Sequence, residues 1–309
     1  MADKISTRQA YGDALVALGR ENQQIIVMDA DLSKSTMTAG FKKEFPERFF
    51  NAGIAEANMM GMAAGLALSG KTVFASTFAM FAAGRAYEII RNSIAYPKAN
   101  VKICATHAGI TVGEDGASHQ CIEDLALMRV IPGMTVVHPA DAVSAKKLLG
   151  KIAAEDGPAY VRLGRLNIPV LYDEAADIQL GKGNCVKDGS DATVIACGLM
   201  VNEALIAAEK LEKEGISLRV IDMHTIKPID EEIIVKAASE TKAIITAEEH
   251  SVIGGLGAAV AEVVVKKCPV KMAMVGIQDR FGQSGKPQAL MEEYHITAAD
   301  IAKAVKETL

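Results

Sequence analysis

Short apolar runs of strand length alternate with segments of helical periodicity along the whole chain. Continuous apolar strands that are separated by helices are typical of a parallel sheet with both faces covered. In the first half, the pattern predicts strands at 25–28, 71–75, 101–105, 134–137 and 159–163. It predicts helices near 7–20, 54–69, 81–95, 121–129 and 141–154. We therefore expect a parallel α/β domain.

The alternation stops between about 165 and 190, where turn-forming Gly, Pro, Asn and Asp residues accumulate. Beyond this stretch it resumes, with strands near 192–197, 217–221, 243–247 and 272–275, and helices near 200–213, 231–239, 255–266 and 297–307. The sequence thus predicts two parallel-sheet α/β domains, residues 1–170 and 191–309, joined by a linker at 171–190. Ser6 with Gln9, and Thr297 with Asp300, have the spacing of a capping box at the start of the first and last helix.

The composition and charge of the chain limit the classes of protein to which it can belong. The chain has 309 residues, 50% hydrophobic and 23% charged, so each half can bury a core of its own. Its formal net charge of −5 and interspersed charges disfavour nucleic-acid binding. Its five cysteines show no ligand-like spacing, so we expect no disulfide framework, no zinc site and a reducing compartment. A polar N-terminus and the lack of apolar runs of about 18 residues predict a cytoplasmic protein without a membrane span.

Glu56 is the first candidate for chemistry, because it lies in a stretch of small and apolar residues from Gly53 to Gly65. One interpretation is structural: a first-turn helix residue is stabilised by the positive end of the helix dipole, with Asn51 as a turn or cap residue. The other is a buried carboxylate that shares or donates a proton to a ligand nitrogen. Position in the sequence leaves both open.

Phe78 and Phe81 form the second candidate, three residues apart at a predicted strand-to-helix junction. They could be ordinary core aromatics, or a flat wall on which a heteroaromatic ring stacks. Ligands bind at the carboxyl ends of strands in open parallel sheets, which favours the second interpretation.

A long polar loop from Thr106 to Gln120 also follows a predicted strand and contains His107, Asp115 and His119. Such loops often carry function, whereas the spacing resembles no common zinc or iron site. Two further features have alternative explanations. Arg162 and Arg165 could form a salt-bridged pair at the domain boundary or an anion clamp. The glycines at 254–257 could be a phosphate loop or a close packing turn.

Together, these strings resemble the thiamine-diphosphate enzymes, specifically the central and C-terminal domains of transketolase, over essentially the whole chain. The similar segments are Gly53–Glu56 (the glutamate motif), Thr77–Phe81 (the ring-stacking motif), and Thr106–His107, Gly113–Gly116 and Ser118–Gln120 (the substrate loop). The resemblance implies transfer of a two-carbon ketol unit from a ketose phosphate to an aldose phosphate, with sugar phosphates as substrates.

The resemblance also implies roles for residues. Glu56 would hydrogen-bond the cofactor's aminopyrimidine and promote removal of the thiazolium proton. Phe81 would stack on that ring with Phe78 beside it, and Asp31 belongs to the same cofactor-binding set. Asp115 and His119 would meet sugar hydroxyls near the reacting carbon, and His107 completes the implied catalytic set. The residues implied for the substrate phosphate are Arg8, Ser35, His107 and Arg165.

One family feature is missing from the chain. Transketolases bind the diphosphate and Mg²⁺ through a Gly-Asp-Gly motif and a later Asn on an N-terminal domain, and this sequence has no such pair. The resemblance therefore implies an N-terminal partner subunit that holds Mg²⁺, with this chain as a homodimer within an α2β2 assembly. Two smaller departures are Gly84, where many transketolases have a third aromatic residue, and Ala57, which replaces a polar residue after the glutamate.

Three alternatives to a split transketolase are weighed against the same residues. A 1-deoxy-D-xylulose-5-phosphate synthase has the same domain order, but typically an arginine at the position of His107. The β subunit of a 2-oxo acid dehydrogenase matches in size, but lacks the string at 113–120. A non-catalytic binding or regulatory module would have no reason to retain Glu56, Phe81, Asp115 and His119 together.

Overall fold

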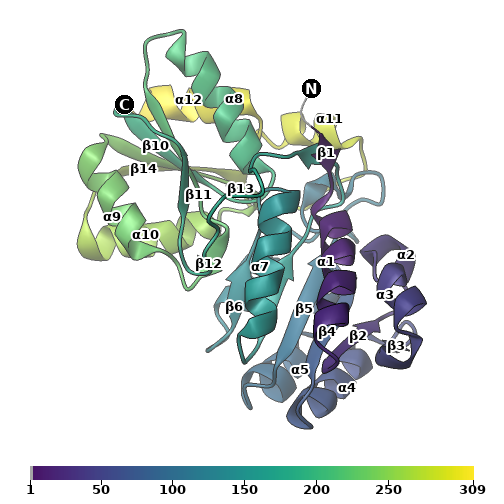
Figure 1. The fold of residues 1–309 in the computed structure, drawn as a ribbon. Helices are drawn as coiled ribbons and strands as arrows, with labels where there is room; N and C mark the ends of the chain where they lie inside the picture. Colours follow the sequence, from purple (N-terminus) through teal and green to yellow (C-terminus); the bar gives the residue numbers. More distant parts are fainter. Residues whose placement is uncertain (1–2) are drawn as a thin grey trace.

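The computed structural model describes residues 3–309, and Figure 1 shows them as two sheets with helices on their faces. The first sheet has seven strands in the order β12-β6-β7-β5-β4-β2-β3. Strands β2 to β7 are paired in parallel, and β12 is antiparallel to β6. The bounds are β2 Ile25–Asp29, β3 Phe49–Asn51, β4 Thr72–Phe78, β5 Val101–Thr106, β6 Thr135–Val137, β7 Ala159–Arg162 and β12 Thr225–Lys227.

Helices cover both faces of this sheet. On one face α1 and α7 pack together over a core that includes Tyr11, Leu15 and Leu149. On the other face α4 packs on β4 and on the segment that follows Phe81. The bounds are α1 Thr7–Glu21, α2 Ser33–Thr36, α3 Ala39–Glu44, η1 Pro46–Arg48, α4 Glu56–Leu68, η2 Phe81–Arg85, α5 Tyr87–Ile89, η3 Ile90–Ala95, η4 Ile110–Val112, α6 Asp124–Arg129 and α7 Ala142–Ala154.

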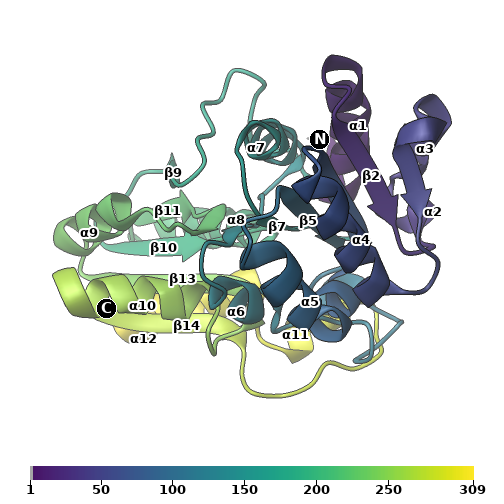
Figure 2. The ribbon, with the colours of Figure 1, turned by 90° about the horizontal axis from the view of Figure 1, so that it is seen from below.

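The second sheet has five strands in the order β14-β13-β10-β11-β9, with β9 antiparallel at the edge. Its strands are β9 Asn184–Lys187, β10 Ala192–Ala196, β11 Leu218–Asp222, β13 Ala243–Ser251 and β14 Lys271–Ile277. The helices of this half are α8 Met200–Glu212, α9 Glu231–Glu240, α10 Leu256–Lys267, α11 Pro287–Glu293 and α12 Ala298–Thr308. A separate ribbon pairs β1, Lys4–Ile5, with β8, Ile168–Pro169. Figure 2 shows α9, α10 and α12 around the second sheet.

The two halves interlock. Strand β12 comes from the second half of the chain but completes an edge of the first sheet. One apolar cluster continues from Met128 and Met134 to Ile226 and Val260, and another joins Ile110 of the first half to the core of the second sheet. The expected linker at 171–190 contains β9, which pairs with β11.

The predicted α/β class is confirmed, and one predicted helix is different. The segment 81–95 consists of two π-helical turns, η2 and η3, on either side of the short α5. π-turns often occur at functional sites, and η2 begins at Phe81. The helix caps also differ in detail. Ser6 accepts a hydrogen bond from the Gln9 amide, but the Gln9 side chain donates to Asp13, so the box is only half formed.

Thr297 and Asp300 form a complete capping box at the start of α12, as their spacing predicts. Asp141 and Ser144 form another at α7, which their sequence did not lead us to expect. Across residues 3–309, no helix has the length and apolar character needed to cross a bilayer.

Candidate active site

Glu56 is the first residue of α4 and its carboxylate is 1% exposed. The structure thus shows a first-turn position and burial together, and the role of Glu56 toward a ligand stays a prediction. Its partner is Arg85, whose Nη1 lies 2.7 Å from Oε2 and whose side chain is half exposed. The Arg85 guanidinium also lies over the Phe81 ring, 4.8 Å from its centroid. Asn51 does not cap the helix, because its side-chain oxygen accepts from the amides of Asp31 and Gly53.

Four rings gather where β4 and β5 end. Phe78 and Phe81 stack with centroids 5.8 Å apart and an 18° angle between planes. Phe78 is buried and stacks on His107 at 3.9 Å, whereas Phe81 is only partly covered. His119 lies edge-on to Phe81 at 5.4 Å. The fold thus brings the two phenylalanines and the histidines of the polar loop together into one aromatic cluster.

His107 follows β5 directly and lies in the left-handed region, with φ of 57°. Its ring is buried, and Nδ1 is 2.9 Å from the Thr106 hydroxyl. Burial lowers the pKa of His107 to about 3, and the charges of Arg8 and Arg165 contribute in the same direction. The ring is therefore neutral at physiological pH and lies beside two guanidinium groups.

Those two guanidinium groups form a positive corner. Arg8 comes from α1, and its Nη1 donates to the Ser35 carbonyl at 2.8 Å, rather than to the Ser35 hydroxyl. Arg165 follows β7 and lies 3.5 Å from the exposed Glu114 carboxylate. The pKa of Arg8 is lowered, first by burial and then by the charge of Arg165. Two cations held this close together favour an anion between them.

Two other candidates are exposed. Asp115 is exposed on the loop, and Asp31 is exposed and bonded to the Asn51 amide at 3.0 Å. Arg162 is not part of an anion clamp, which corrects that alternative. It is completely buried, and its Nε lies 2.9 Å from the Asp124 carboxylate.

The glycines at 254–257 form a packing turn rather than a phosphate loop. The buried Glu248 carboxylate accepts from the amides of Leu256 and Gly257, both at 2.7 Å, and so occupies the N-terminus of α10. A bound phosphate would need those same donors. Adjacent Glu249 is also buried, and its carboxylate accepts from the amide of Thr111 in the polar loop.

Sequence reasoning missed Arg85 and Glu249. Arg85 lies four residues after Phe81, a spacing that brings side chains to one face of a helical turn. Glu249 is one of two adjacent glutamates, with Glu248, that follow the apolar start of the strand β13. Two carboxylates at the end of an apolar run are the sequence signal that could have identified it.

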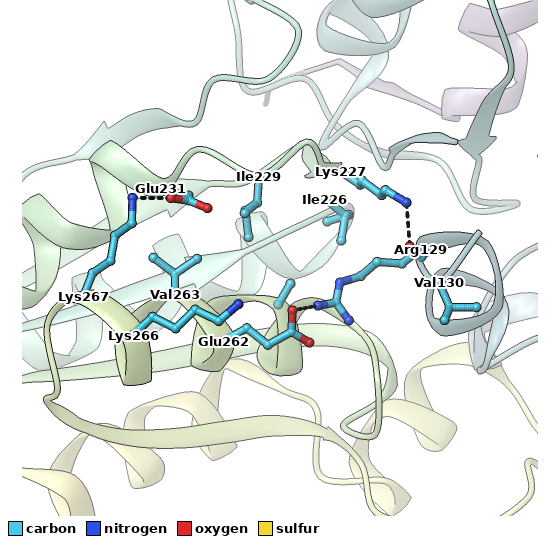
Figure 3. Close-up of a pocket in the computed structure, with 11 residues that line it drawn as sticks. Arg129, Val130, Ile226, Lys227, Ile229, Glu231, Glu262, Val263, Lys266 and Lys267 are labelled. Carbon is cyan, nitrogen blue, oxygen red and sulfur yellow. Dashed lines mark hydrogen bonds and ion pairs between the residues drawn. The ribbon is translucent and has the colours of Figure 1, made fainter. Parts of the chain in front are cut away.

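A separate cavity of about 370 Å³ lies between α6, β12 and α10 (Figure 3). Three of the cations that line it have partners: Arg129 pairs with Glu262 at 2.5 Å, Lys227 donates to the carbonyls of Arg129 and Ile131, and Lys267 pairs with Glu231. None of the candidate residues lines this cavity. The described part of the chain also contains no group of three or more His, Cys, Asp or Glu side chains that could hold a metal ion.

Both halves of the chain match models of known families. Residues 3–170 match the pyrimidine-binding domain of transketolase, and residues 181–301 match the transketolase C-terminal domain. These matches cover most of the chain and agree with the resemblance in the sequence.

Individual relatives agree. A putative transketolase C-terminal section from Methanocaldococcus jannaschii is 54% identical over 305 residues, covering 98% of this chain and 96% of that protein. Human transketolase is 40% identical over 310 residues, but this chain spans only 49% of its length. Among solved structures, a split gene transketolase described as an inactive β4 tetramer is 57% identical, with a TM-score of 0.93 and coverage of 99% of this chain and 98% of that one.

Proposed function

This chain belongs to the transketolase family, as the C-terminal subunit of a split transketolase, and we propose that it supplies the pyrimidine-binding half of a thiamine-diphosphate site and most of the sugar-phosphate site. The observation that carries the proposal is the buried Glu56 beside the partly covered Phe81 ring. A buried carboxylate can share a proton with a ligand nitrogen, and an accessible ring face can support a flat heterocycle.

The donor set fits the cofactor's aminopyrimidine. Glu56 would hold a proton at the ring nitrogen, and Phe81 would support the ring with Phe78 behind it. Arg85 now lies against both Glu56 and Phe81, so its exposed side chain would move when the ring binds. When bound, thiamine diphosphate supplies a nucleophilic carbon and an electron sink for the transferred two-carbon unit.

The positive corner suits the substrate. Arg8, Arg165 and neutral His107 would hold the terminal phosphate of the sugar, with Ser35 nearby. His107 adds a hydrogen bond there rather than a charge, because its ring is neutral above about pH 3. His119, edge-on to Phe81, would meet sugar hydroxyls near the reacting carbon, and exposed Asp115 would join it from the loop.

The partner assignment rests on what the chain would have to supply for the diphosphate. The sequence lacks the Gly-Asp-Gly motif and later Asn with which transketolases hold the diphosphate and its metal, and Mg²⁺ with a diphosphate requires oxygen ligands and donors. We propose that an N-terminal subunit binds Mg²⁺ and the diphosphate and forms the side of the active site opposite Phe81. The two kinds of subunit would form an α2β2 assembly. Asp31, exposed just after β2, would contribute to cofactor binding.

Ketose and aldose phosphates are the proposed substrates, because the corner is built for a terminal anion. Two relatives bear more specialised names, one for an apulose-4-phosphate transketolase and one for a 6-deoxy-6-sulfo-D-fructose transketolase.

We propose domain limits of 1–170 and 191–309, with the stretch between them as a connector, and a cytoplasmic location. The free state of all five cysteines supports the location.

The test is two-carbon transfer by this chain assembled with its N-terminal subunit, thiamine diphosphate and Mg²⁺. With xylulose 5-phosphate and ribose 5-phosphate, we expect activity from the pair and none from this chain alone. Glu56→Gln should lower kcat at least 100-fold while calorimetry still detects cofactor binding. The control, Glu88→Gln, changes an exposed glutamate of α5 and should be neutral. Activity without the partner, or an unimpaired Glu56→Gln enzyme, would refute the proposal.

A further inference from the structure

Glu249 connects the second half of the chain to the polar loop of the first half. It lies in β13, is 1% exposed, and its Oε1 accepts a hydrogen bond from the Thr111 amide at 2.7 Å. Thr111 belongs to η4, the single turn between His107 and Asp115. A backbone donor in the substrate loop is thus fixed by a carboxylate 138 residues away in sequence.

The loop is shaped around that carboxylate. Gly109 has a φ of +82°, and a Cβ at this position would overlap the Glu249 carboxylate. Only glycine allows both this conformation and this close approach. The Gly109 amide donates to the Cys121 carbonyl at 2.8 Å, which closes the base of the loop.

Other contacts hold the loop from the same side. Ile110 is completely buried in the apolar cluster of the second half, with Ile277 and Leu290. Gln120 at the other end donates to the Gly113 carbonyl at 3.2 Å and to the Gln283 carbonyl at 2.9 Å. The segment that contains the substrate residues therefore rests on the C-terminal half as well as on its own domain, where the Ala108 amide donates to the Leu163 carbonyl.

Glu249 itself is held in place by Arg162. The Arg162 Nη2 donates to the Glu249 carbonyl at 3.0 Å and to the Cys121 carbonyl at 3.2 Å, so one guanidinium ties β13 to the end of the loop. The neighbouring Glu248 faces α10 instead. Two adjacent buried carboxylates thus act on different parts of the molecule.

We propose that Glu249 is a positioning residue for the substrate loop: by holding the Thr111 amide, it fixes the backbone between His107 and His119, so that the C-terminal half takes part in substrate binding. This inference rests on the proposed function for its kinetic consequence, but not for its structural one. Small displacements of substrate-holding groups cost up to about 100-fold in rate, so a loosened loop should be detectable.

The experiment compares three variants of the full chain, alone and in the assembled enzyme. Glu249→Asp shortens the side chain by one methylene and withdraws the carboxylate from Thr111, while it keeps the charge near Arg162. Glu249→Gln keeps the length and an oxygen acceptor. Glu248→Asp is the matched control, because it shortens the adjacent buried carboxylate, which serves α10. The readouts are amide hydrogen exchange, and KM separately from kcat.

In Glu249→Asp, we expect amides at 109–120 to exchange at least tenfold faster, and kcat/KM for the ketose phosphate to fall about 10- to 100-fold, mainly through KM. Glu249→Gln should restore slow exchange and most of the affinity. Glu248→Asp should speed exchange at the start of α10 and leave the loop and KM unchanged.

Unchanged exchange at 109–120 in Glu249→Asp, or the same loop and KM effects in Glu248→Asp, would overturn the inference. Exchange in the isolated chain requires no sugar and no partner. If the wild-type assembly failed to transfer two-carbon units while the loop responded as expected, the proposed function would be wrong, and the positioning of the loop by Glu249 would still be supported.

Discussion

His107 offers a direct measurement at the scale of a single residue. Its pKa is lowered to about 3 by burial and by Arg8 and Arg165, so we expect its ring to stay neutral from pH 8 down to about pH 4. Because the unfolded chain takes up this proton below about pH 6.5 and the native chain does not, the group's contribution to stability is lost as pH falls from about 6.5 towards 3. NMR titration of the imidazole carbons, with His107→Asn to assign the signal, tests this. A midpoint near 6.5 would contradict it.

The site residues that could be predicted from the sequence share one property: each is of a residue type that is unusual among its neighbours in the sequence. Glu56 in a run of small apolar residues and Phe78 with Phe81 at the end of a strand are examples, and the structure places Phe78, Phe81 and His107 in contact. Arg85 could not be predicted in the same way, because an exposed arginine within a helical segment is ordinary. Its meaning comes from the contact with Glu56, which is 29 residues away in sequence.

At the scale of an element, the capping box of α12 makes a quantitative prediction. The Thr297 side chain faces the Asp300 amide, and the Asp300 carboxylate accepts from the Thr297 amide at 3.0 Å and from the Thr297 hydroxyl at 2.6 Å. Thr297→Ala should therefore lower the free energy of unfolding by about 1 kcal/mol. Thr308→Ala, in the last turn of the same helix, is the control and should change it by less than about half of that. Urea unfolding measures both, and equal effects would disprove the capping role.

Strands could be predicted from the sequence where they contain a long, continuous apolar run. The parallel strands β2, β4, β5 and β7 have continuous buried positions. By contrast, β12 has only three residues and β9 only four, with polar residues in both. Their pairing depends on neighbours from distant parts of the chain. The π-turns at 81–95 were equally inaccessible, because their residues have ordinary helical periodicity.

At the scale of the molecule, one buried ion pair lies where the halves meet. Arg162 of β7 contacts the Asp124 carboxylate of α6 and the Glu249 carbonyl of β13, and both charged side chains are fully buried. Tyr160 also donates to Asp124 at 2.8 Å. Removing one member of such a pair leaves a buried charge without a partner, which costs more than the pair itself contributes. Arg162 and Asp124 both belong to the first half, so it is the hydrogen bond from Arg162 to the Glu249 carbonyl that links this ion pair to the second half. We therefore expect unfolding of the two halves to be coupled through Arg162.

We accordingly expect Arg162→Met to lower the free energy of unfolding by about 3–5 kcal/mol. Arg219→Met is the control: Arg219 pairs with exposed Asp188 and partly exposed Glu240 within the second half, so it should cost about 1 kcal/mol or less. The double variant Arg162→Met with Asp124→Leu should recover part of the loss, because no unpaired charge remains, although the Tyr160 hydroxyl loses its acceptor. Urea unfolding followed by hydrogen exchange in both sheets measures the cost and the coupling. A cost of Arg162→Met no larger than that of Arg219→Met would contradict the expected role of the buried ion pair. If exchange in the two sheets stayed coupled in Arg162→Met, the apolar clusters that cross between the halves would be what couples them.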